Sequence, residues 1–144
     1  MLSTMCEEIL PDYYAPSMIG STTDQLVFEY LFDNHLPHLS EHFKKINMPL
    51  ALVTIPWFLC IFIGFLSWES TLRVLDCFFY DGRTILFQVG LAILKLNAAR
   101  ILQLEEPHEI TEILKNTPIP SSTLLQVPIP TAFFPLFSIF VFIF

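Results

Sequence analysis

Apolar residues recur along this chain at helical spacing, whereas alternation with a period of two never persists. Thr22 and Gln25 fit a capping box, in which two side chains satisfy free backbone N–H groups at the start of a helix. The apolar positions that follow lie on one side of such a helix: Leu26, Val27, Tyr30 and Leu31. Asn34 is expected to end this first helix.

Prolines and hydroxyl residues mark the next two predicted helices. Pro37 suits the first turn of a second helix, where its missing N–H is not needed. The apolar stripe of that helix is Leu39, Phe43 and Ile46. Thr54 is predicted to cap a third helix that has Pro56 in its first turn and residues 57–66 as its body.

Three further helices are predicted in the second half of the chain. Ser67 is expected to cap the fourth, whose apolar stripe is Trp68, Leu72, Leu75 and Phe79. Asp81 and Gly82 form a turn signal before a fifth helix over 84–100, with these residues inward: Ile85, Val89, Ala92, Ile93 and Leu96. Pro107 opens a short sixth helix, with Ile110, Ile113 and Leu114 inward. The pattern predicts an all-α fold.

Composition narrows the class of protein. The 144 residues suffice for one domain or a piece of one, and 14 acids against 7 Lys and Arg give a net charge of −7. Because phosphate binding needs clustered cations, nucleic acid is not expected as a partner. No glycine-rich phosphate loop occurs. The 53% of apolar residues and the 15 Phe instead raise the question of a membrane.

Two uncharged runs bear on that question. Residues 48–68 are long enough to span a bilayer, but Pro49 and Pro56 interrupt the run. The amphipathic neighbours also need a core to cover them, so a buried core is favoured and a span is the alternative. The tail, residues 117–144, has four prolines and then a 14-residue apolar run, 131–144, which contains a fifth proline and is short of a span. A read-through of non-coding sequence is the favoured interpretation of the tail, and a membrane anchor is the alternative.

Candidate metal and catalytic residues give weak patterns. Cys6, Cys60 and Cys77 form no CxxC pair, and the last two are interpreted as small core residues. His35, His38 and His42 lie near Glu41 but are interpreted as the polar face of the second helix rather than a zinc site. The acidic residues Glu105, Glu106, Glu109 and Glu112 are interpreted as solvated surface. No catalytic, metal or cofactor-binding residue is therefore predicted, and no cofactor.

Six motifs occur in an order that is specific to one family. They are Leu10–Tyr14 (LPDYY), Asp24–Phe28 (DQLVF), Leu36-Pro37 with His42-Phe43, Pro56–Leu59 (PWFL), Arg73–Gly82 (RVLDCFFYDG) and Leu86–Lys95 (LFQVGLAILK). From about residue 2 to residue 115, the chain resembles the second half of a TBC domain, the all-helical catalytic domain of Rab GTPase-activating proteins. The resemblance implies that residues 1–116 are the C-terminal helical lobe of such a domain and that 117–144 lie outside the family pattern.

The same resemblance implies a mechanism. In the family, an arginine of an I-x-x-D-x-x-R motif and a glutamine of a Y-x-Q motif enter the nucleotide site of the GTPase. An arginine supplied in this way is worth about 10³- to 10⁵-fold in rate. The arginine motif does not occur in this chain, because Ser70, Tyr80 and Asn97 stand where its three arginines would need an Asp. The glutamine motif does not occur either, because the residues two positions after the four tyrosines are Ala15, Pro16, Phe32 and Gly82. We therefore expect a chain that begins after the catalytic motifs and does not accelerate GTP hydrolysis alone.

Arg73 and Asp76 lie three residues apart on the predicted fourth helix. An ion pair that fixes this helix is the favoured interpretation, and a contact with a GTPase is the alternative.

The function implied by the resemblance is that of an enzyme regulator, not an enzyme: a partial Rab GTPase activator in vesicle traffic whose partner is a small GTPase of the Rab family. Its contact residues are unknown. The alternatives are a non-catalytic interaction module and a small membrane-associated protein held by residues 48–68 and 131–144. The first eight residues fit no signal peptide, so the expected location is cytoplasmic or peripheral on endomembranes, with a membrane-inserted tail as the alternative.

Overall fold

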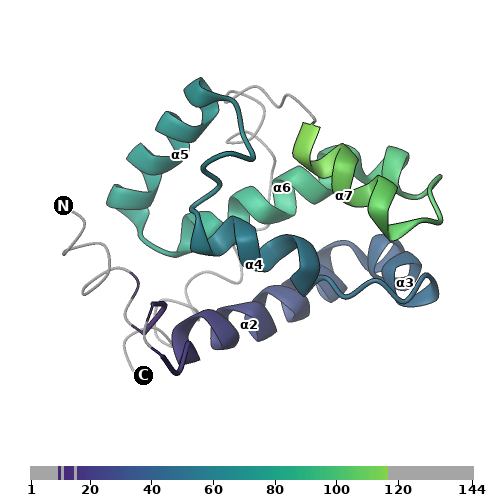
Figure 1. The fold of residues 1–144 in the computed structure, drawn as a ribbon, viewed down its shortest axis with the longest axis horizontal. Coiled ribbons are helices and arrows are strands. Elements are labelled where there is room, and N and C mark those ends of the chain that lie inside the picture. The colour runs from purple at the N-terminus through teal and green to yellow at the C-terminus, as the bar shows by residue number, and fades with distance from the viewer. Residues whose placement is uncertain (1–9, 11, 15, 117–144) are drawn as a thin grey trace.

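The computed structural model describes residues 10, 12–14 and 16–116 (Figure 1). Every regular element in that part of the chain is a helix, which confirms the all-α prediction. In chain order the helices are α2 (Ile19–His35), α3 (Pro37–Lys45), α4 (Ala51–Leu59), α5 (Trp68–Asp81), α6 (Thr84–Ile101) and α7 (Pro107–Asn116). The predicted division at residue 116 stays a prediction, because the tail lies outside the described residues.

Helix α6 is the centre of the core. It packs against α4, α5 and α7, and α2 packs against α3 and α4 (Figure 1). Three aromatic rings join α2, α4 and α6. The ring centroids of Phe28 on α2 and Phe58 on α4 lie 5.3 Å apart, and both rings contact Phe87 on α6. Gly90 of α6 permits this packing, since a Cβ there would lie 2.9 Å from the Phe28 ring. The close approach explains a glycine in the middle of a buried helix.

Local signals that need no tertiary partner are confirmed. Pro37 occupies the first turn of α3. The Ser67 side chain caps α5 by accepting a hydrogen bond from the Ser70 N–H at 3.3 Å. Gly82 ends α5 with a φ of +69°, a backbone conformation that favours glycine. Pro107 opens α7 as predicted.

Two predicted caps are wrong. Helix α2 begins at Ile19, so Thr22 lies inside it and donates to the Met18 carbonyl at 3.0 Å. Thr54 lies inside α4, where its hydroxyl reaches the Leu50 carbonyl at 3.2 Å and lies 2.5 Å from Gln25 Oε1 of α2. A hydroxyl that satisfies a carbonyl one turn earlier fits within a helix, so its position in the sequence does not fix the helix start.

The predicted helix body over 57–66 is also wrong, because α4 ends at Leu59. Left-handed backbone at Ile61, Phe62 and Gly64 turns the chain away from the helix axis. Ile61 and Phe62 are still buried, as are Trp57 and Phe58, so the prediction of a buried core is confirmed. Residues 48–68 therefore do not form one continuous helix that could cross a bilayer.

One helix among the described residues, α6, has the length and hydropathy to cross a membrane, with 61% of that stretch buried by its neighbours. A central helix of a water-soluble domain meets the same criteria, and the core position of α6 fits that explanation.

The predicted stripe of α2 is half right, since Leu31 is buried and Val27 packs against the core. Leu26 and Tyr30 are 65% and 56% exposed, whereas the residues that α2 buries are Ser21, Asp24, Phe28, Leu31 and Phe32. On α6, Leu96 is likewise exposed, although its four predicted partners are buried. Apolar character alone does not select the buried face of a helix when more than one face is apolar.

Candidate functional surface

A buried polar cluster joins the start of the described fold to two helices. The Tyr13 hydroxyl donates a 2.6 Å hydrogen bond to Asp24 Oδ2 on α2, and Arg83 Nη1 lies 3.7 Å from the same oxygen. Burial raises the pKa of Asp24, while the hydrogen bond from Tyr13 and the charge of Arg83 oppose that rise. Arg83 thus places a positive charge beside a carboxylate that is otherwise buried in the fold.

Sequence reasoning did not identify this cluster. Its signal was present, since Tyr13 and Asp24 both belong to motifs that carry the family resemblance. The three residues come from distant parts of the chain, and only the packing of α2 beside the start of α6 brings Arg83 to Asp24.

A second polar group lies where α2 meets α3. Asp33 accepts hydrogen bonds from Ser40 and Lys44, and the Ser40 bond is the main cause of its lowered pKa. A hollow of about 340 Å³ lies beside it. Its lining residues are Glu29, Phe32, Asp33, Ser40, Phe43, Lys44, Asn47, Met48, Pro49 and Leu50. Its polar lining is Glu29, Asp33, Ser40, Lys44 and Asn47, and Asp33, Ser40 and Lys44 are already joined to one another by hydrogen bonds.

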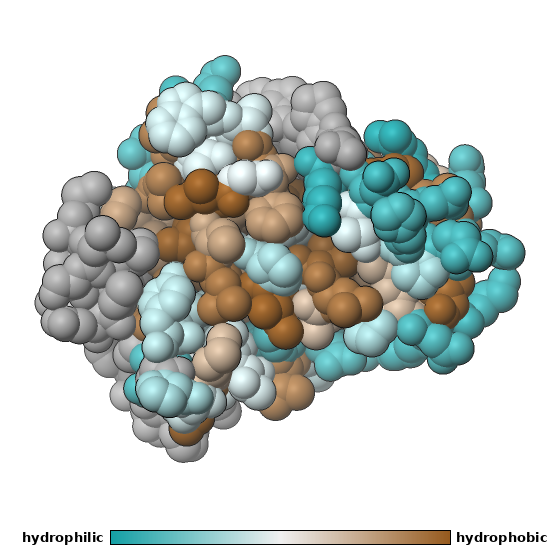
Figure 2. Space-filling view, in the orientation of Figure 1, coloured by the Kyte–Doolittle hydropathy of each residue, from teal (hydrophilic) through white to brown (hydrophobic). Residues whose placement is uncertain are grey.

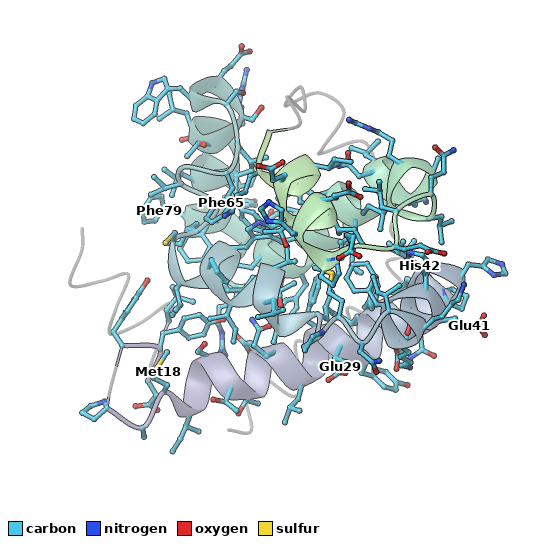
Figure 3. The ribbon with its side chains drawn as sticks, turned by 45° about the vertical axis from the view of Figure 1, so that its right-hand side comes forward. Met18, Glu29, Glu41, His42, Phe65 and Phe79 are labelled. Atoms are coloured by element: carbon cyan, nitrogen blue, oxygen red, sulfur yellow. The ribbon has the colours of Figure 1, made fainter. Side chains whose placement is uncertain are left out.

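The predicted histidine candidates are dispersed. His42 Nε2 lies 2.7 Å from the Leu104 carbonyl and ties α3 to the loop before α7. His38 is exposed and His35 is half-buried. Glu41, which Figure 3 labels beside His42, is exposed as well. Within residues 10, 12–14 and 16–116, no group of three His, Cys, Asp or Glu side chains is placed to hold a metal ion.

The remaining single-residue predictions have mixed outcomes. Cys60 is exposed, so its assignment to the core is wrong, because the turn after α4 directs it outward. Cys77 is half-buried, and Cys6 lies outside the described residues. The four glutamates of 105–112 are exposed, which confirms them as solvated surface.

Arg73 and Asp76 are both exposed on α5, and no ion pair within 4.0 Å joins them. The favoured prediction of an ion pair between them is wrong for this geometry. Arg73 and Asp76 instead belong to a row of exposed side chains at helical spacing that also includes Glu69 and Tyr80.

The most unusual surface is a row of apolar side chains on α5. The outer stripe consists of Trp68, Leu72, Leu75 and Phe79, the apolar stripe that the sequence predicted for this helix. Trp68 is 73% exposed, Leu72 and Phe79 are exposed, and Leu75 is half-buried. Helix α5 uses its other side for the core, through Ser70, Thr71, Val74 and Phe78. The predicted apolar stripe is therefore present, but most of it lies outside the core of the described residues.

Apolar surface continues next to the outer stripe. Leu52, Ile55 and Ile63 are exposed on α4 and the segment after it. Figure 2 shows brown side chains gathered over α4 and that segment, whereas hydrophilic side chains gather over α3 and α7. Phe65 is half-buried there, and Figure 3 shows it on the same side of the molecule as Phe79. Large apolar side chains exposed together in this way are typical of an interaction site.

Comparisons with known proteins agree with the resemblance. The model of the Rab-GTPase-TBC domain family matches residues 1–102. The chain is 39% identical over 116 residues to a candidate GTPase-activating protein of Emericella nidulans, covering 81% of this chain and 10% of that protein. It is 37% identical over 115 residues to GTPase-activating protein gyp2 of Schizosaccharomyces pombe, covering 80% of this chain and 16% of that protein.

Similarity extends to solved structures. The crystal structure of a Chlamydomonas flagellar RabGAP TBC domain superposes with a TM-score of 0.74 and 28% identity, covering 86% of this chain and 41% of that one. The chain thus spans less than half of that domain and between a tenth and a sixth of the two relatives named above.

Proposed function

Because the chain belongs to the Rab-GTPase-TBC domain family, we propose that it forms the C-terminal part of a GTPase activator for a small Rab GTPase. The observation that carries this proposal is the family match over residues 1–102, together with relatives named as GTPase-activating proteins. The proposed setting is vesicle traffic, in the cytoplasm or at the surface of endomembranes.

The proposed role of this stretch is support and partner contact rather than catalysis. None of its three arginines stands in an I-x-x-D-x-x-R motif, and none of its four tyrosines stands in a Y-x-Q motif. Arg83 faces the buried Asp24, while Arg73 and Arg100 are exposed on α5 and α6. Without an arginine and a glutamine from those motifs, the chain has no means to neutralise the phosphoryl charge or orient the attacking water.

Single-turnover GTP hydrolysis tests this role. The 144-residue chain is added in excess to a panel of GTP-loaded Rab proteins, with a complete TBC domain as the positive control. We expect the intrinsic rate to be unchanged by the chain, whereas the complete domain raises the rate by orders of magnitude. Acceleration by the chain alone would show that catalysis uses residues outside the two motifs.

A second candidate function is a non-catalytic interaction module, which the exposed outer stripe of α5 favours. Binding of GTP-loaded Rab to the chain without acceleration of hydrolysis would support this candidate. The third, a membrane-held protein, is tested by carbonate extraction of membranes, since a protein inserted in the bilayer stays in the pellet. We expect the chain to be released from membranes by carbonate.

A further inference from the structure

We propose that residues 60–63 are a two-state switch: in one form they make the left-handed turn that ends α4, and in the other they continue α4 as a helix. The turn begins the connection between α4 and α5 (Figure 1). Ile61 and Phe62 have φ values of +48° and +58°. Two consecutive left-handed residues other than glycine are uncommon, and a β-branched isoleucine is an outlier there. The turn is therefore a strained element that its surroundings hold in place.

The hydrogen bonds of the turn are those of a Schellman motif, a common way to end a helix. The Phe62 N–H donates to the Trp57 carbonyl at 2.8 Å. The Ile61 N–H donates to the Phe58 carbonyl at 3.3 Å. The position that Ile61 occupies in this motif is usually glycine. A glycine with a φ of +84°, Gly64, stands three residues later and is the better end for α4.

The helical form would bury the same side chains as the turn. Ile61 and Phe62 are 2% and 0% exposed, and the Phe62 ring centroid lies 5.6 Å from that of Trp57. In a continued helix, Ile61 and Phe62 follow Phe58 by three and four positions, so they stay on the face that Phe58 buries. Residues 57–63 contain no proline or glycine, so their sequence permits a helix. Because burial is similar in both forms, local backbone preferences decide between them.

The Tyr14 hydroxyl stabilises the turn form. It donates to the Leu59 carbonyl at 2.9 Å. In a continued helix the Ile63 N–H would donate to that carbonyl, whereas in the turn it donates to the Cys60 carbonyl at 2.9 Å. Tyr14 thus supplies a donor to a carbonyl that the turn withdraws from the helical pattern. This bond connects the switch to the segment before α2.

The switch also bears on where α5 begins. Four more residues of helix lengthen α4 by about 6 Å. Residues 64–67 then remain as the connection to Trp68, the first residue of α5. This short connection has to take a new path, and we expect the first turn of α5 to shift with it. Release of Tyr14 would thereby reposition Trp68, so that the two residues are coupled through α4.

Nuclear magnetic resonance of the full chain tests the switch with a matched pair of variants. Ile61→Ala and Ile61→Gly both remove most of the buried side chain and differ by one methyl group. Alanine favours a helix and disfavours a positive φ, whereas glycine does the reverse. We expect the Cα chemical shifts of residues 60–63 to become helical in Ile61→Ala and to keep turn values in Ile61→Gly. The ratio of helical form to turn should differ about tenfold or more between the two.

Tyr14→Phe removes the hydroxyl and keeps the ring, so the population of the helical form should rise several-fold. This variant decides the question if the Ile61 variants fail to fold. Its matched control, Tyr80→Phe, removes a hydroxyl from a side chain that is 90% exposed on α5 and should leave residues 60–63 unchanged. An unchanged turn in Tyr14→Phe, or equal shifts in the two Ile61 variants, would overturn the proposal. None of these measurements depends on GTPase activation.

Discussion

The hydroxyl of Tyr13 donates a 2.6 Å hydrogen bond to the carboxylate of Asp24 inside the fold. Both residues are almost fully buried, and the Arg83 guanidinium approaches the same carboxylate oxygen at 3.7 Å. This contact holds the segment before α2 against α2 itself and against the start of α6. A buried carboxylate without these partners would be costly, so the cluster should be a measurable part of stability.

Replacing Tyr13 with Phe removes the donor and leaves the ring. We expect the free energy of unfolding to fall by about 1–3 kcal/mol, because Asp24 loses a hydrogen bond that water cannot easily replace. Urea denaturation followed by circular dichroism measures the change. The matched control is Tyr80→Phe, since Tyr80 is 90% exposed and should change stability by less than about 0.5 kcal/mol. Equal effects of the two variants would contradict the role of the cluster.

The pH dependence of stability should change when Asp24 is replaced by Asn. Burial raises the pKa of Asp24 above its ordinary value of 3.8, so the folded state holds the proton to a higher pH than the unfolded state. The contribution of Asp24 is therefore fully present below about pH 4 and is lost as the pH rises through the folded pKa.

Asn at position 24 cannot ionise, so the variant does not lose this stability as the pH rises. The stability of Asp24→Asn relative to the unaltered chain should thus increase from about pH 4 to pH 7, as measured by urea midpoints at several pH values. A relative stability that stays constant or declines over that range would show that the pKa of Asp24 is not raised.

Gly90→Ala should destabilise the core by about 1–3 kcal/mol, although alanine is the better helix former. The new methyl would lie 2.9 Å from the Phe28 ring, which Phe58 and Phe87 hold in place. In a double-mutant cycle with Phe28→Leu, the smaller side chain should relieve part of the loss. Additive effects of the two changes would mean that the methyl and the ring do not collide.

Helix α2 offers a test of which face it buries. Phe28→Ala should cost about 3–5 kcal/mol, because Phe28 is fully buried. Leu26→Ala should change stability by less than about 0.5 kcal/mol, because Leu26 is mostly exposed. Thermal melting of the two variants side by side measures the difference. A large loss of stability in Leu26→Ala would show that Leu26 belongs to the core, as the sequence pattern suggested.

The cap of α5 can be tested with one residue. Ser67→Ala should lower stability by about 1 kcal/mol, because the Ser70 N–H loses its acceptor. Ser67→Asp keeps an acceptor at the same position and should be close to neutral. Urea midpoints compare the two, and a neutral Ser67→Ala would show that water replaces the cap.

The sequence was most informative where a local rule fixes the backbone. Ser67, Gly82 and Pro107 mark helix ends as predicted, because a cap, a positive φ and a missing N–H act within a few residues. It was least informative about Thr22 and Thr54, whose hydroxyls serve equally well inside a helix. For the candidate surface, the sequence identified the α5 stripe by its spacing, but only the structure shows that most of the stripe is exposed.

The sequence by itself determined the helical fold and the family, because helical periodicity and an ordered set of motifs are properties of the chain alone. Only the tertiary structure decided that Phe28 enters the core in place of Leu26, that Arg83 meets Asp24, and that Trp68 faces outward. The physical reason is that a side chain is buried only if another helix packs against its face of the helix. An apolar side chain favours burial wherever it stands, but the packing of the other helices selects which apolar face is covered.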